Sequence, residues 1–171
     1  VETGDCAFDA TPQDATPFGA VVGVVPTHSS AVQETYKELC RLHRGVVPLV
    51  DGDDEGKKKL TGLLRLPKAP KTVLIWRDDW EIEDAIMWIL KADETAVISP
   101  LNDRLNWSVN SVEDVLAEFK VKNGQGRAKA NYLAYEEIAG VIRDNDLCHK
   151  RARVVLNAIT QAALGIHDGC V

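Results

Sequence analysis

The spacing of hydrophobic positions divides the chain into two parts. In the first part, short apolar runs rich in β-branched residues occur at 19–26, 45–50 and 71–76. Such runs are typical of strands that are buried on both faces of a parallel sheet. Between them, 31–42 repeats apolar side chains every three or four positions and 56–66 is also helix-like. The pattern therefore predicts strands that alternate with amphipathic helices.

The alternation stops after the segment 76–90, and helical patterns follow one another. Ser111 and Asp114 resemble a capping box, in which two side chains bond to backbone N–H groups at a helix start. The later helices are predicted at 84–90, 111–120, 128–144 and 147–165.

Strands that alternate with helices usually form right-handed parallel crossovers. We therefore predict an α/β fold, with a mainly parallel central sheet flanked by helices and a helical lobe after it. The core is expected at 1–100, and the lobe at 101–171 completes the core or packs on it.

Charge and cysteine usage narrow the class of protein. A formal net charge of -6 argues against binding nucleic acid through bulk positive charge, so any DNA contact must be local or bridged by metal. The four cysteines are scattered without a CxxC pair, which favours reduced thiols and a cytoplasmic location. No apolar run reaches the roughly 18 to 20 residues of a membrane span, so no membrane partner is expected.

The strongest chemical signal is the acidic turn after the run at 45–50. Asp51, Asp53, Asp54 and Glu55 crowd four carboxylates into five positions. Open α/β sheets bind ligands at the carboxyl ends of their strands. In an extended chain Asp51 and Asp53 project to the same side, where they could hold a divalent cation together. Mg²⁺ accepts one or two carboxylates and leaves positions for a phosphate.

The same turn allows other interpretations. An EF-hand loop that starts at Asp51 would need Glu at its twelfth position, which is Gly62, so this interpretation fails. A phosphatase with a DxD motif usually has Thr or Val where this chain has Glu55, which weakens that interpretation without excluding it. A solvated acidic turn between a strand and a helix stays open.

A second acidic group follows the run at 71–76. Strands that are consecutive in a parallel sheet are often neighbours, so this group could face the first across one site. Glu81 and Glu83 are the expected inward pair, although acids at a helix start also serve as caps. The group contains Asp78, Asp79, Glu81, Glu83 and Asp84.

These segments together resemble the Toprim domain of the OLD (overcoming lysogenization defect) family of ATP-dependent nucleases. The resemblance rests on Val1-Glu2, VVPLVDGDDEG, the IED of EIEDAI, and Lys129 within GRAKANYLAYEEIA, and it spans residues 1 to about 140. It implies a Toprim-like, Rossmannoid core and a metal-dependent DNA endonuclease or nickase. It also implies an ABC-type ATPase region that precedes the domain in a longer protein, through which oligomers could form.

The resemblance also assigns residues. Asp51, Asp53, Glu83 and Glu2 would bind Mg²⁺ or Mn²⁺, with two ions expected, and Glu81 is a further candidate ligand. Lys129 would stabilise charge on the transferring phosphate and contact DNA, with Arg127 as its nearest substitute.

Two rival functions stay open. One is a non-catalytic docking or DNA-binding module, which predicts no tight metal binding at the DxD pair. The other is a DxD-type phosphatase, which predicts a covalent aspartyl-phosphate. Toprim domains also occur in topoisomerases, but the tyrosines here lie in helical patterns without a catalytic context. Hydrolysis is therefore preferred.

Overall fold

The computed structural model describes residues 18–27, 29–120 and 132–165, and its described part is mostly helical. Its strands are β1 (Leu49–Val50) and β2 (Leu74–Ile75), and two short 3-10 helices are η1 (Ser29–Ala31) and η2 (Lys91–Asp93). The α-helices are α1 (Phe18–Val21), α2 (Val32–Leu42), α3 (Asp54–Leu64), α4 (Ile82–Leu90), α5 (Glu94–Leu105), α6 (Val112–Lys120), α7 (Tyr132–Asp144) and α8 (Asp146–Leu164).

The predicted α/β fold with a central sheet is wrong. The described residues contain one sheet of two parallel strands, in which Leu49 pairs with Leu74 and Val50 with Ile75. A sheet of this size cannot form the Rossmannoid core that the sequence suggested. The division into a core at 1–100 and a lobe at 101–171 stays a prediction.

The run at 19–26 is not a strand. Its first residues belong to α1, and the chain that follows leaves Val24 and Val25 70% and 54% exposed. A short apolar run does not distinguish a buried strand from other conformations, because its periodicity carries no helical or extended signature.

The strand at 45–50 is shorter than predicted. The carbonyl of Pro48 accepts a bond from Leu74 N (2.8 Å), and that of Val50 accepts one from Trp76 N (3.0 Å). Pro48 has no N–H group, so it cannot extend the ladder on its other side.

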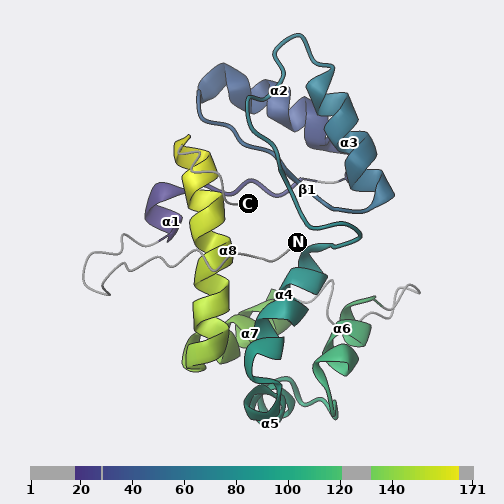
Figure 1. The fold of residues 1–171 in the computed structure, drawn as a ribbon, viewed down its shortest axis with the longest axis vertical. Helices are drawn as coiled ribbons and strands as arrows, with labels where there is room; N and C mark the ends of the chain where they lie inside the picture. Colours follow the sequence, from purple (N-terminus) through teal and green to yellow (C-terminus); the bar gives the residue numbers. More distant parts are fainter. Residues whose placement is uncertain (1–17, 28, 121–131, 166–171) are drawn as a thin grey trace.

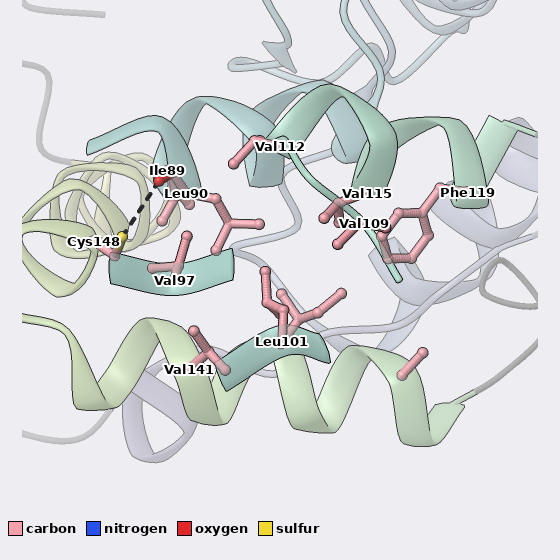
Figure 2. Packing of buried hydrophobic residues seen from close by; sticks show 12 residues of the cluster. Ile89, Leu90, Val97, Leu101, Val109, Val112, Val115, Phe119, Val141 and Cys148 are labelled. Carbon is pink, nitrogen blue, oxygen red and sulfur yellow. Dashed lines mark hydrogen bonds between the residues drawn. The ribbon is translucent and has the colours of Figure 1, made fainter. Parts of the chain in front are cut away.

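The main hydrophobic core is formed by α4, α5, α6, α7 and the start of α8. Leu90, Val97, Leu101 and Val112 are fully buried there, and Phe119 stacks at a tilt against Tyr135. Figure 2 shows Leu90, Val97, Leu101, Val112 and Phe119 in this core, on helices α4, α5 and α6. The Cys148 thiol donates to the Leu90 carbonyl (3.7 Å), which fixes the start of α8 against α4.

A smaller core lies under α2 and α3 and consists of Tyr36, Val50 and Leu63. In Figure 1, α2 and α3 lie at one end of the molecule, α4 to α7 lie at the other, and α8 runs between the two ends. The strand pair lies between these helical groups, so β1 leads into α3 while β2 leads toward α4.

Polar side chains fix the helix ends. Ser111 Oγ accepts from Asp114 N (3.1 Å) and Asp114 Oδ2 accepts from Ser111 N (3.0 Å), so the predicted capping box is confirmed. Asn145 caps α8, which ends at Gly165 with a left-handed φ of 71°.

None of the described helices combines the length and the apolar character needed to cross a bilayer.

Replacing Leu90 by Ala is expected to lower the free energy of unfolding by about 2–5 kcal/mol, because a fully buried leucine leaves a cavity. Chemical denaturation measures the change. Leu147→Ala on α8 is the control, since Leu147 is 48% exposed and should shift stability by no more than about 0.5 kcal/mol. Equal effects of the two substitutions would contradict the assigned core.

Candidate functional site

The turn after β1 is held tightly against the segment after β2. Gly52 N donates to the Trp80 carbonyl (2.7 Å), and the Gly52 carbonyl accepts from Asp79 N (3.1 Å). A Cβ at Gly52 would lie 1.8 Å from the Arg77 carbonyl oxygen, so the backbones meet where only glycine fits. This contact places the turn after β1 directly beside the segment after β2.

Asp51 and Asp53 are fixed by the start of α3. Asp53 is the N-cap residue, and its Oδ1 accepts from Gly56 N (2.7 Å). A Cβ at Gly56 would lie 1.9 Å from the Asp51 carbonyl oxygen, so a second glycine lets the helix begin directly beside Asp51. Asp53 therefore has a structural role as a helix cap. Its second carboxylate oxygen, Oδ2, does not take part in the bond to Gly56 N.

The second acidic group opens α4. Asp84 Oδ2 accepts from Glu81 N (2.9 Å), so Asp84 caps the helix, as the structural interpretation of this group predicted. Glu83 is only 2% exposed and borders apolar side chains of α4 and α6, among them Met87 and Phe119. Asp78 lies apart from the cluster and pairs with Lys57 (3.2 Å) at the surface.

Electrostatics connect the predicted ligands. Burial raises the pKa of Asp51, and the charges of Asp53, Glu81 and Glu83 raise it further, while Lys59 opposes them. The charges of three of the four other predicted acids therefore act on Asp51. Burial first, and the charges of these three acids after it, disfavour the ionised form of Asp51, and a cation bound beside it would favour that form.

The fit to a divalent cation is partial. Carboxylate oxygens are the ligands that Mg²⁺ and Mn²⁺ prefer, and each carboxylate offers several lone pairs. Within the described ranges, however, no three His, Cys, Asp or Glu side chains are placed to hold a metal together. A cation bound by three of these acids therefore requires side-chain rotation, most of all at Glu83, which is packed beside α6.

Three predicted site residues, Glu2, Arg127 and Lys129, lie outside the described residues. Asp54 and Glu55 are exposed in the first turn of α3, where carboxylates interact favourably with the helix dipole.

Lys59, whose charge opposes those of the acids around Asp51, was not among the predicted site residues. Its signal was the run of three lysines directly after DGDDEG.

Gly52→Ala is expected to lower the free energy of unfolding by about 3 kcal/mol, because its Cβ would overlap a backbone carbonyl. Thermal or chemical denaturation measures the loss. Gly23→Ala is the matched control, since a Cβ there meets nothing within 4 Å. A tolerated Gly52→Ala would show that the two turns are not held in this contact.

Asp51→Asn is expected to stabilise the metal-free protein at neutral pH. The raised pKa means that ionised Asp51 costs folding free energy, and this cost appears as the pH rises through the ordinary aspartate range to the raised value. The difference from wild type should vanish in acid, where the carboxyl is protonated in both states. Melting temperatures across pH measure it, with about 2–4 °C for each kcal/mol removed.

The control for this pH series is Asp54→Asn, which removes the same charge from an exposed position. It should not raise the melting temperature. A wild-type protein as stable as the Asp51→Asn variant at neutral pH would contradict the electrostatic cost at Asp51.

Comparison with known proteins gives this chain no family. No family model matches it, and neither a curated protein nor a solved structure gives a match. The resemblance to the OLD-family nucleases therefore stays a prediction that rests on the motifs alone.

Proposed function

We propose that this protein hydrolyses DNA phosphodiester bonds with Mg²⁺ or Mn²⁺, using the acids gathered between β1 and α4. The observation that carries the proposal is the position of Asp51, which is partly buried and surrounded by the charges of Asp53, Glu81 and Glu83. A carboxyl whose pKa is raised by burial and by neighbouring acids is a candidate functional group.

Asp51 is the proposed central ligand. Its carboxyl is not used in a helix cap, and a cation beside it would lower its pKa and remove the repulsion from its neighbours. Asp53 would add its second oxygen while its first keeps the cap on α3. Glu81 and Glu83 would contribute after rotation, from the start of α4.

The cation supplies Lewis-acid polarisation of the phosphate and an activated water when it is bound. The chain's own residues hold and orient the reacting groups. The close backbone contact at Gly52 fixes the separation of the two acidic turns, and the α3 cap fixes the direction of Asp53.

The motif resemblance extends the proposal to the whole protein. By that resemblance, Glu2 would be a further ligand, Lys129 or Arg127 would contact the phosphate, and two ions would be bound. The domain would then act next to an ATPase region of a larger protein.

A non-catalytic docking module is the second candidate. It is favoured by the use of Asp53 and Asp84 as helix caps and by the lack of a preformed three-acid group in the described residues. It differs from the nuclease in one measurable property, since it predicts no cation binding at Asp51.

The test is conversion of supercoiled plasmid to nicked and linear forms with Mg²⁺ or Mn²⁺, with EDTA as a blank. Asp51→Asn and Asp53→Asn are expected to lower the rate by about 100-fold or more, because each removes a negative charge that would hold the cation acting on the phosphate. Asn is a good N-cap residue, so Asp53→Asn keeps the start of α3.

Asp54→Asn serves as the control, because it removes an equal charge one position along at an exposed site. It should cut the plasmid as wild type does. Calorimetric titration with Mn²⁺ gives a readout that does not depend on cutting. No Mn²⁺ binding and no cutting by the folded wild-type chain would overturn the proposal and favour the docking module.

A further inference from the structure

Basic residues are concentrated in one segment of an otherwise acidic chain. Residues 56–77 contain seven of the 20 Lys and Arg residues and none of the 26 Asp and Glu residues. The chain as a whole has a formal net charge of -6, so the rest of it is more acidic than that value suggests. The segment begins in α3, directly after the acidic turn, and ends beyond β2.

The part of this segment farthest from the acids is the least neutralised. Lys57 pairs with Asp78 at 3.2 Å, and Lys58 lies 3.9 Å from Glu55. In contrast, Arg65, Lys68 and Lys71 are exposed and form no ion pair within the part of the chain that the structure describes.

The geometry of α3 connects this basic end with the acids. Lys58 and Arg65 are both exposed and seven residues apart, so they share one face of the helix. The 11 residues of α3 span about 16 Å at 1.5 Å per residue. That length corresponds to roughly five base pairs, since phosphates repeat about every 3.4 Å along each strand of a duplex.

We propose that Arg65, Lys68 and Lys71 bind the phosphate backbone of duplex DNA about five base pairs from the acids at the start of α3, and that Lys58 binds the same backbone closer to them. The inference rests on the proposed phosphodiester hydrolysis and adds the surface that holds the substrate. It also resolves how an acidic protein contacts DNA, because the positive charge is local.

Composition favours a duplex over other anionic partners. Residues 56–71 contain no aromatic side chain, whereas proteins that bind single strands stack bases on aromatic rings. A membrane-surface helix needs a broad apolar face, yet the exposed face of α3 is mainly polar, with Leu64 as its exposed large apolar residue.

The experiment uses a fluorescently labelled duplex of about 20 base pairs, which is long enough to span the site. Its binding is measured by fluorescence anisotropy over a series of salt concentrations. Ca²⁺ replaces Mg²⁺, and the whole chain is used. The triple variant Arg65→Ala, Lys68→Ala, Lys71→Ala is expected to bind at least about 10-fold more weakly. Its slope of log affinity against log salt should fall by about 2.7, for three lost phosphate contacts.

The control variant Arg143→Ala, Lys150→Ala, Arg153→Ala removes the same charge from α7 and α8 and should bind as wild type does. Circular dichroism checks that both variants fold. Equal weakening of the two variants, unchanged affinity in the first, or no duplex binding by wild type would each overturn the inference. Loss of binding to phosphatidylserine vesicles in the first variant, with duplex binding intact, would overturn it in favour of a membrane.

Plasmid cutting separates this inference from the proposed function. Suppose that the triple variant Arg65→Ala, Lys68→Ala, Lys71→Ala loses duplex binding and that neither it nor the wild type cuts plasmid. The binding surface then stands and the proposed hydrolysis fails. If the triple variant cuts and binds as wild type does, the surface fails while the hydrolysis stands.

Discussion

The contact of the Gly52 turn with the segment after β2 is the constraint on which the rest of the site depends. Two strands of two residues each cannot by themselves fix the positions of the chains that leave them. The hydrogen bonds of Gly52 with Trp80 and Asp79 join the turn after β1 to the turn after β2, beyond the strand ends. Because a side chain at Gly52 would overlap a carbonyl oxygen, the separation of the two acidic turns is set by backbone alone.

The acids are supported from two different cores. Asp51 and Asp53 stand before α3, whose Leu63 belongs to the small core, while Glu83 and Asp84 open α4, whose Leu90 belongs to the large one. Apolar burial on both sides therefore offsets the repulsion that is concentrated between them. This arrangement allows unfavourable charges to persist at the junction without a large sheet beneath them.

The sequence predicted helices better than strands, for a physical reason. The amphipathic repeat at 31–42 and the Ser111–Asp114 box are local signals, and both elements formed as expected. A strand depends on partners elsewhere in the chain, so the apolar run at 19–26 carried no such information. Pro48 was a local sign that β1 would be short, because it lacks an N–H group. The pairing of β1 with β2 was predictable from their consecutive positions in the chain, whereas the burial of Glu83 beside α6 depended on tertiary packing.

Helix α8 connects the large core to the segment that precedes the acidic turn. Its first turns are anchored to α4 by the Cys148 thiol on the Leu90 carbonyl and by Arg151, which bonds to the Trp88 carbonyl at 2.6 Å. Its other end passes Gly45, where a Cβ would lie 3.6 Å from the Ala163 carbonyl oxygen. The helix is a rod of 19 residues, about 28 Å long, that joins the large core to the segment leading into β1. A change in the tilt of α8 would therefore shift the backbone at Gly45, six residues before Asp51.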